Sequence, residues 1–368
     1  MKLKVNRNQP ALRWAALLGA VGMAVTACGG STPAAPADHF TTVMNYNAAD
    51  TEAYLYKCAQ TEGQVNYYTD ATLSKETLAP AFEKKYPGVK VVITEATTQL
   101  VQKIADEAAA GKDTFDVLGS SYGNIPRDGT YFAKFDSPGR KLVQPSLSQP
   151  YYLGYGGYVE AVAYNPKLAP TGTFSSDWKS LLAPALKGKI YFPTDSATYQ
   201  LIGMLKAEYG LDFLKSLASQ VRVSGGTGRA VADQVVAGTA PISMAASVAY
   251  VKRYPATAPL KFQVMSPALA LYFIASIDKK APHPCAARLM VDWLANPDGG
   301  GVVETQVGNA LPYKGVALFN FEVPGNLPVS QWNIVYGGDA KMLKAYKTPA
   351  EALKDWTNIF QTVFVASS

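Results

Sequence analysis

The sequence predicts an α/β fold in two lobes, each a mixed, mostly parallel sheet flanked by helices. Strand and helix patterns alternate between residues 63 and 121, and the alternation resumes between residues 188 and 247. Two extended apolar segments, YVEAVAYNPK at 158–167 and FQVMSPALALYFI at 262–274, lie where these regions adjoin. We expect each segment to cross between the lobes as one strand of a two-strand hinge.

In the first half, three strands alternate with two helices. The strands are expected at 63–69, 89–96 and 115–121, and the helices at 73–88 and 97–111. Pro87 and Gly88 stop the first helix. Thr97 or Thr98 is a natural N-cap for the second helix, and Gly111 is a natural stop. This alternation indicates a largely parallel sheet.

The second half repeats the alternation and ends with a strand and a helix. Strands are expected at 188–194, 221–226, 240–246 and 267–277, and helices at 197–210, 228–238 and 284–299. The apolar run PALALYFIASI at 267–277 has 11 residues, which suits a buried strand and is too short to span a bilayer.

The N-terminal segment has the pattern of a secretory signal. Basic residues precede an unbroken run of apolar and small residues at 14–27, which is short of the roughly 20 residues that span a bilayer. Val25-Thr26-Ala27-Cys28 looks like a lipobox, so we predict a signal peptide at 1–27, lipidation of Cys28 and a flexible tether at 28–46. An ordinary signal peptide with a stray cysteine is the alternative.

Charge and composition narrow the partners. Without residues 1–27 the chain carries 30 Lys and Arg against 28 Asp and Glu, a net charge that does not suggest nucleic acid. The remaining length suits two domains of ordinary size. We expect an exported monomer that binds a small molecule and no nucleic acid.

Cys58 and Cys285 are the two cysteines that follow the predicted anchor. Disulfides persist in exported proteins, so we predict a Cys58–Cys285 bond, with two unpaired buried thiols as the alternative. The chain has two histidines, His39 and His283, and no C-x-x-C pattern, so we expect no zinc site and no cofactor.

Ser121 lies in GSSYG, residues 119–123, which matches the G-x-S-x-G pattern of a hydrolase nucleophile. A nucleophile elbow needs a helix directly after the serine, and Pro126 and Gly129 interrupt the turns that follow. The base would have to be His39 or His283. We therefore expect no enzyme here and interpret Ser120 and Ser121 as ligand-binding residues or, more simply, as turn and cap residues.

Hydroxyl side chains follow several predicted strands, next to predicted helix N-termini. They are Thr69, Thr72, Thr97, Thr98, Ser120, Ser121, Ser196, Thr198 and Thr227. Ligands of open α/β sheets bind at the carboxyl ends of strands, where helix N-termini favour an oxyanion. Each of these residues alone is more often a plain N-cap. Together they predict a cradle for an oxyanion-bearing solute.

The chain resembles bacterial extracellular solute-binding proteins of ABC importers, in the branch that holds ferric-iron, thiamine and phosphonate binders. Five stretches carry the likeness through their order and spacing, from about residue 60 to 312. They are EGQVNYYTDATLSKETLAPAFEKKYPGVKV, FDVLGSS, AVAYNPKL, LKGKIYFPTDSATYQ and KAPHPCAARLMVDWLANPDGG.

The resemblance implies a type II periplasmic-binding fold with the ligand in the cleft between two lobes. We expect lobe 1 at 47–160 and 266–368 and lobe 2 at 161–265. The implied partners are a small solute and an ABC permease of the cytoplasmic membrane, near which a lipid anchor holds the receptor. The expected location is the cell envelope, as an exported, palmitoylated and lipid-anchored protein.

Arg229 sharpens the oxyanion hypothesis. It lies in the first turn of a predicted helix, where a cation is disfavoured unless an anion answers it, and a phosphonate, phosphate or carboxylate could do so. Pairing with Asp233 at i+4 is the alternative. Asp70 and Asp195 could receive an ammonium if the solute is a zwitterion, although either could be a cap or a surface acid.

Ferric iron is the alternative ligand. The resemblance implies adjacent tyrosines after the strand that follows VVAG, and this chain has Val248-Ala249 there, with a single Tyr250. The carboxylate of the iron pattern after the third strand is replaced by GSSYGN. A different tyrosine site stays open, and its candidates are Tyr122, Tyr158, Tyr199 and Tyr250, although aromatic walls of a cleft are the commoner explanation.

Overall fold

The structure is a computed structural model that describes residues 38–71, 73–96, 100–112, 114–121, 127–169, 172 and 174–367. The predicted signal peptide, Cys28 and the tether up to residue 37 lie outside these residues. Within them, no helix combines the length and the apolar character needed to cross a bilayer.

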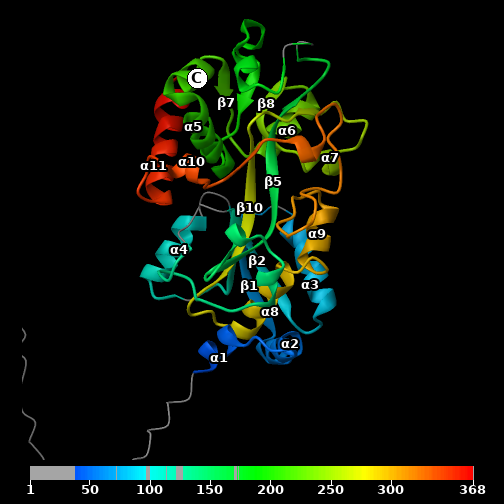
Figure 1. Ribbon diagram of the computed structural model, residues 1–368, viewed down its shortest axis with the longest axis vertical. Coiled ribbons are helices and arrows are strands. Elements are labelled where there is room, and N and C mark those ends of the chain that lie inside the picture. The colour runs from blue at the N-terminus through cyan, green and yellow to red at the C-terminus, as the bar shows by residue number, and fades with distance from the viewer. Residues whose placement is uncertain are drawn as a thin grey trace, which may run out of the picture. The chain divides into compact units, whose positions relative to one another are not determined.

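The described residues form a mixed α/β fold around a twisted sheet (Figure 1). Its strands are β1 (Gln64–Thr69), β2 (Lys90–Glu95), β3 (Val117–Ser121), β4 (Ser148–Gln149), β5 (Tyr152–Tyr164), β6 (Ile190–Phe192), β7 (Val221–Val223), β8 (Ile242–Ser247), β9 (Lys261–Gln263), β10 (Ala268–Ile277) and β11 (Ile334–Tyr336). Its α-helices are α1 (His39–Asn45), α2 (Thr51–Glu62), α3 (Ala79–Lys85), α4 (Leu100–Ala109), α5 (Ser196–Ala218), α6 (Gly228–Ala237), α7 (Tyr250–Arg253), α8 (Pro284–Leu294), α9 (Gly300–Gln306), α10 (Ala340–Leu343) and α11 (Pro349–Ile359).

The main strand order is β2-β1-β3-β10-β5-β8-β6-β7. Strands β2, β1 and β3 are parallel, as are β8, β6 and β7, and these two groups form the sheets of the two lobes. Strands β5 and β10 are antiparallel to each other and connect the lobes. The first part of β5 pairs with β10, whereas its last residues pair with β8 and β9.

The two crossing strands are nearly inaccessible to solvent along their length, which explains their continuous apolar sequence. They match the segments that were expected to cross between the lobes. The alternation predicted for residues 63–121 and 188–247 also matches the order of β1 to β3 and β6 to β8. The sequence therefore predicted the strands that position the lobes.

The N-terminal end of the described chain corrects the predicted tether, which was expected to extend to residue 46. Residues 39–45 form helix α1, whose N-cap Asp38 accepts a hydrogen bond from the Thr41 backbone N–H at 2.7 Å. Val43 and Met44 are buried, and α1 contacts α8. The tether prediction failed here because two apolar side chains in a short polar segment gave little sign of packing.

Helix α2 joins α8 through the two cysteines that were expected to pair. Cys58 of α2 and Cys285 of α8 form a disulfide, with their Cα atoms 5.8 Å apart. The carboxylate of Glu62, at the end of α2, accepts hydrogen bonds from the backbone N–H groups of Cys285 and Ala286 at 3.0 and 2.8 Å. This carboxylate therefore caps the N-terminus of α8, where a negative charge is favourable.

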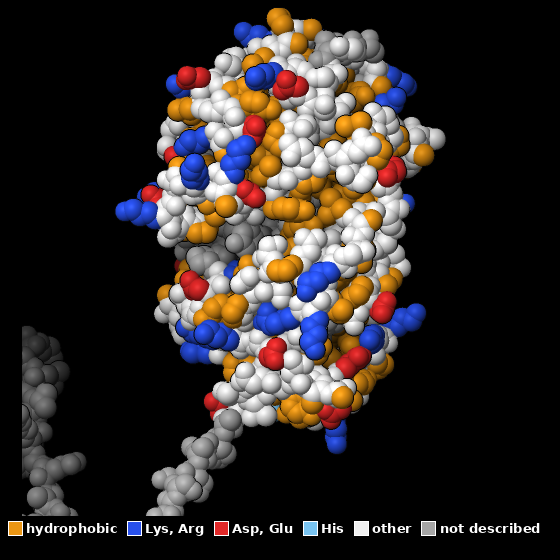
Figure 2. Space-filling view, in the orientation of Figure 1, with side chains coloured by type: hydrophobic (Ala, Val, Ile, Leu, Met, Phe, Trp, Pro, Cys, Tyr) orange, Lys and Arg blue, Asp and Glu red, His pale blue; other side chains and the backbone are white. Residues whose placement is uncertain are grey.

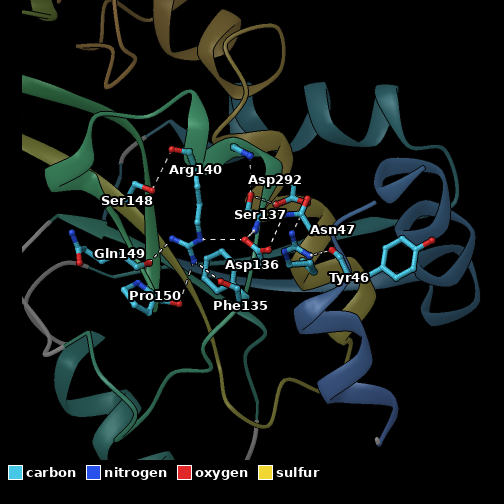
Figure 3. A network of polar contacts seen from close by, with 12 residues as sticks. Tyr46, Asn47, Phe135, Asp136, Ser137, Arg140, Ser148, Gln149, Pro150 and Asp292 are labelled. Atoms are coloured by element: carbon cyan, nitrogen blue, oxygen red, sulfur yellow. Dashed lines mark hydrogen bonds and ion pairs between the residues drawn. The ribbon is translucent and has the colours of Figure 1, made fainter. Parts of the chain in front are cut away.

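A network of polar contacts ties the segment 135–150 to the N-terminal segment and α8 (Figure 3). Asn47 donates to Asp136 at 2.7 Å, and Ser137 donates to Asp292 of α8 at 2.6 Å. The Arg140 guanidinium donates to the carbonyls of Phe135, Gln149 and Pro150. We call this part of the first lobe, together with α1, α2 and α8, the base.

The C-terminal helices pack on the second lobe. Helix α11 contacts α5, and buried Trp356 lies so close to Gly203 of α5 that a Cβ there would be 2.4 Å from the indole. Phe360 and Phe364 continue this packing against Phe192 of β6. We therefore propose that residues 340–367 belong to lobe 2, whereas the sequence led us to expect them in lobe 1.

Candidate ligand-binding pocket

A pocket that is partly open to solvent lies between the two groups of parallel strands. Its lining comes from the carboxyl ends of β1, β3 and β8, the N-termini of α5 and α6, the crossing strands, α7 and the segment after α9. The lining residues are Asp70, Ser121, Tyr158, Glu160, Asp195, Ser196, Ala197, Thr227, Gly228, Arg229, Ser247, Tyr250, Arg253, Phe273 and Asn309. This is the edge at which α/β sheets bind ligands.

Eight of the residues that the sequence singled out line this pocket together. They are Asp70, Ser121, Tyr158, Asp195, Ser196, Thr227, Arg229 and Tyr250. Asp70 and Ser121 are themselves connected, because the Ser121 backbone N–H donates to both carboxylate oxygens of Asp70, at 3.0 and 3.2 Å. Residues from lobe 1 thus face residues from lobe 2 across one space.

Four other candidates are not among the residues that line the pocket, and each has a contact within the fold. Thr69 accepts a hydrogen bond from the Ala71 backbone, and Ser120 accepts one from the Arg127 guanidinium at 2.5 Å. Thr198 donates to the Pro193 carbonyl at 2.9 Å, and Tyr199 packs edge-on against Phe360. Thr72, Thr97, Thr98 and Tyr122 lie outside the described residues.

Asp195 lines the pocket, but its carboxylate is already engaged by the chain. It is the N-cap of α5, accepting from the Thr198 backbone N–H at 3.1 Å, and it accepts from the Gly228 backbone N–H of α6 at 2.7 Å. One buried carboxylate therefore accepts hydrogen bonds from the N-termini of two helices. The pKa of Asp195 is nevertheless raised, because burial outweighs these hydrogen bonds.

Arg229 shows both interpretations that the sequence left open. Its Nε lies 3.5 Å from Asp233 Oδ2, the expected i+4 partner. Its guanidinium carbon also lies 6.0 Å from the Tyr250 ring and 5.5 Å from the Tyr254 ring, which fits cation–π contacts. Tyr254 donates to the other Asp233 oxygen at 2.5 Å. These contacts hold Arg229 at the pocket wall.

A second arginine, Arg253 of α7, was not anticipated. Its Nε donates to the Val307 carbonyl at 3.1 Å and its Nη2 to Asn309 Oδ1 at 2.8 Å. Asn309 in turn donates to Glu304 Oε2 at 2.6 Å, and burial raises the pKa of Glu304 to about 7. This chain of contacts links α7 in lobe 2 to α9 and the segment after it.

Glu160 of β5 is the least compensated charge in the pocket. Its side chain is 5% exposed, and in the described part of the chain its Oε2 is buried with no hydrogen-bond partner. Burial, and then the neighbouring charge of Asp195, raise its pKa well above the usual range. It is the one charged residue in the apolar run 158–164, a signal that the sequence interpretation did not use.

The other lining residues that the sequence did not single out lie on the crossing strand β10, at the end of β8 and at helix ends. They are Ala197, Gly228, Ser247, Phe273 and Asn309. Ser247 is directly opposite Glu160 in the β5–β8 pairing, so the crossing strand contributes to the site itself. No local pattern distinguishes these residues.

The two histidines that were the candidate bases for Ser121 have other contacts. Both histidines lie in the described part of the chain. His283 Nδ1 lies 2.9 Å from Asp116, which precedes β3, and the whole of that strand, about 16 Å at roughly 3.3 Å per residue, separates Asp116 from Ser121. His39 lies 3.8 Å from the sulfurs of the disulfide.

His39, Cys58, Glu62 and Cys285 are the candidate metal ligands of the described residues, with ligand atoms within 4.8 Å of one another. Both sulfurs belong to the disulfide, however, and Glu62 caps α8. Cysteine binds zinc as a thiolate, and a disulfide has no thiolate. With the disulfide formed, the two cysteines therefore link α2 to α8 and are not available as metal ligands.

Of the four tyrosine candidates for an iron site, Tyr158 and Tyr250 line the pocket and Tyr199 does not. Burial raises the pKa values of both Tyr158 and Tyr250, which favours their neutral forms.

The visible face of the molecule carries interspersed positive and negative side chains, with hydrophobic and uncharged groups across its middle (Figure 2).

Solved structures with the same fold include several periplasmic binding proteins. Periplasmic binding protein P5PA has a TM-score of 0.67 at 18% identity, and iron-bound HitA from Pseudomonas aeruginosa has 0.66 at 19%. AfuA from Actinobacillus pleuropneumoniae, solved with fructose-6-phosphate, has 0.67 at 19%. In each case 82% of this chain and 99% of the other are covered. No curated protein sequence matches the chain.

Residues 67–301, more than half of the chain, match the family described as bacterial extracellular solute-binding protein. The two parallel groups of strands, the crossing strands and the pocket between them agree with that match. The chain therefore belongs to the bacterial extracellular solute-binding protein family and is a solute-binding protein of an ABC importer.

Proposed function

We propose that the solute is a small organic compound with an oxyanion group, such as a phosphate ester, phosphonate or carboxylate. The observation that carries this proposal is the convergence of Arg229 and Arg253 on one pocket. Both guanidinium groups lie against the ring of Tyr250, at 6.0 and 5.4 Å from its centroid. Arginine forks recognise carboxylate and phosphate oxygens with paired hydrogen bonds.

The arginines, rather than the helix N-termini, are assigned the main role in holding the anion. Asp195 already accepts from backbone N–H groups at the starts of α5 and α6, so these ends carry an internal counter-charge. A second anion there would meet its repulsion. This changes the cradle expected from the sequence, in which hydroxyl residues and helix N-termini share the anion.

Binding would proceed by closure of the lobes. Asp70, Ser121 and Asn309 come from the strands and segments of lobe 1, and Thr227, Arg229 and Arg253 from lobe 2. A solute that contacts both sets favours the closed arrangement through its differential affinity. Strands β5 and β10 are the proposed hinge. The structure of AfuA with a phosphorylated sugar supports an anionic ligand on this fold.

Titration calorimetry on the chain from Ser31 onward tests the proposal, with phosphonates, phosphate esters, carboxylates and ferric citrate as probes. Arg229→Ala should weaken an anionic ligand at least tenfold, whereas Ser121→Ala should cost less. Arg222→Ala, which removes an exposed arginine of β7, is the matched control. Unchanged affinity in Arg229→Ala would remove Arg229 from the site.

Ferric iron is the second candidate, favoured by the presence of Tyr158 and Tyr250 beside Asp70 and Glu160 in the pocket. Oxygen ligands of this kind suit a hard cation. If only ferric citrate binds, and Tyr250→Phe abolishes that binding, the tyrosines are the site and the oxyanion proposal fails. We propose no enzymatic activity, so an ester dye should not be turned over.

We also propose that Cys28 carries the lipid anchor and that the exported receptor works as a monomer beside its permease. Labelling of cells with a palmitate analogue should tag the chain, and Cys28→Ala should abolish the label. Release of the unlabelled variant into the medium or the periplasmic fraction would agree with anchoring. A label that persists in the variant would contradict it.

A further inference from the structure

Acidic and basic side chains line the same pocket around Tyr250. Arg229 and Arg253 lie against the Tyr250 ring, and Glu160 and Asp195 line the pocket with them. After burial, which is the largest cause, Glu160 and Asp195 raise the pKa of Tyr250, and Arg253 and Arg229 lower it. We call Glu160 and Asp195 the acidic side of the pocket, and Arg229 and Arg253 its basic side.

On the acidic side, Glu160 lacks a counter-charge in the described residues. No ion pair joins it to a basic group there, and its buried Oε2 accepts no hydrogen bond. Burial without a donor or a cation disfavours the charged form of this carboxyl group and raises its pKa. A ligand that brings a cationic donor to Glu160 favours the charged form again and gains a charge-assisted hydrogen bond.

The two arginines of the pocket contact groups other than Glu160. Arg229 pairs with Asp233, and Arg253 donates to Val307 and Asn309. Asp195 carries the same charge as Glu160 and is held by two helix N-termini. Within the described residues no cation complements Glu160, which leaves that contact to the solute.

We propose that the solute is a zwitterion, whose amine contacts the Glu160 carboxylate while its oxyanion contacts Arg229 and Arg253. The inference rests on the proposed function, since the basic side must hold the oxyanion. It adds the second charge and thereby the substrate class: amino acids with separated charges, aminosulfonates, aminophosphonates and phosphorylated amines. Asp70, on the same pocket wall as Ser121, is positioned to add a second acidic contact.

Three pairs of probes that differ only in an amine separate the two charges. They are β-alanine with propionate, taurine with ethanesulfonate, and O-phosphoethanolamine with ethyl phosphate. In calorimetry at pH 7, the amine-bearing member of at least one pair should bind at least tenfold more tightly than its partner. Binding of both members without this preference overturns the zwitterion inference and leaves the oxyanion proposal standing.

The variant Glu160→Gln keeps the size of the side chain and removes its carboxyl group. It tests whether Glu160 is the residue that contacts the amine of the probe. It should weaken the amine-bearing probe at least tenfold and leave its amine-free partner within threefold. Glu76→Gln, on an exposed glutamate, is the control and should change neither. An amine preference that survives in Glu160→Gln overturns the assignment to Glu160.

Arg229→Ala distinguishes this failure from failure of the proposed function. It should weaken both members of a pair, because both carry the oxyanion. If amine-free anions bind and Arg229→Ala leaves them unchanged, the oxyanion proposal fails. If none of the six probes binds the wild-type chain, the zwitterion inference is overturned as well.

Discussion

Two groups of charged side chains lie at different levels of this molecule, and they differ in how well the chain itself compensates them. At the base, Arg140 lies near exposed Asp136 and donates to nearby carbonyls (Figure 3). Buried Arg288 pairs with Asp292 there. In the pocket, Asp195 is compensated in the same way, but Glu160 is not. The comparison separates charge that stabilises the fold from charge that is left for a ligand.

Arg288 shows how the base compensates a buried charge with a counter-charge. It is fully buried, lies 3.2 Å from the Asp292 carboxylate, and donates to the Tyr46 carbonyl at 3.2 Å. In the part of the chain that the structure describes, its Nε and Nη2 are buried without a hydrogen bond, so the ion pair with Asp292 supplies most of the compensation. In the pocket the two arginines lie on the wall of an open space.

The largest expected effect comes from breaking the base. Arg288→Ala leaves Asp292 buried without its cation, and loss of one partner of a buried ion pair typically costs about 3–5 kcal/mol. Urea denaturation should show this loss, while solute affinity measured well below the transition stays the same. Arg222→Ala, on an exposed arginine, should stay within about 0.5 kcal/mol. A loss under about 1 kcal/mol in Arg288→Ala would contradict the comparison.

The disulfide at the base is the next test. The variant Cys58→Ser with Cys285→Ser opens a covalent link between residues 227 apart, and removal of a native disulfide typically costs about 2–5 kcal/mol. Reduction of the wild-type chain should give a similar loss in urea denaturation. Solute affinity should be retained, because neither cysteine lines the pocket. A tenfold loss of affinity would show that base and pocket are coupled.

Glu160 and Asp195 should respond to substitution with opposite signs. Glu160→Gln removes a buried carboxyl group whose pKa is raised, and should stabilise the empty chain at pH 7 by about 1–3 kcal/mol because Glu160 ionises more easily in the unfolded chain. Asp195→Ala removes the cap of α5 and an acceptor for α6, and should destabilise it by about 2 kcal/mol. Thermal unfolding without ligand measures both. Destabilisation by Glu160→Gln would place Glu160 with the compensated charges.

The smallest effect is on the pH dependence of stability. Burial raises the pKa of Glu304 to about 7 and that of Asp292 to about 6. The ordinary value near 4 applies to both in the unfolded chain, so between pH 7 and pH 5 the folded chain binds more protons. Stability should therefore rise by about 1–2 kcal/mol per group as the pH falls over this range.

Substituting each residue shows how much of the pH dependence of stability comes from Glu304 and how much from Asp292. Glu304→Gln should flatten the upper part of the profile, near pH 7, and Asp292→Asn the lower part, near pH 6. Urea denaturation at intervals of half a pH unit gives both curves. A slope that persists in Glu304→Gln near pH 7 would assign it to another group.

Much of the fold could be predicted because its information is local. The period of apolar residues and the turn residues between them predicted β1, β2 and β3 and the order of the second sheet. Helix α5 was expected to end at Gly210, but the chain continues helically after that glycine adopts φ 82°. A glycine in the left-handed region is a common helix end, so the local signal was correct and the continuation was decided by packing.

The site was only half predictable, because its decisive contacts join distant residues. Asp195 was identified at a helix start, but its second donor, Gly228, is 33 residues away. Arg253 becomes part of the pocket wall through Asn309, which is 56 residues away. Glu160 is the exception. A single acid in an apolar strand can be recognised in the sequence, although only the structure shows that it is buried in the pocket.

The packing of α1 on α8 has a mechanical consequence. A force applied to the chain at Asp38 would pass into α8 through the contacts of α1 and the hydrogen bonds from Arg288 to Val43 and Tyr46. The disulfide joins α2 covalently to α8, so α2 would carry part of the same force. These contacts do not include β5, whereas α8 also packs against β10. A pull at this end would therefore enter the protein at α8, on the base, before it reached the crossing strands and the pocket that they line.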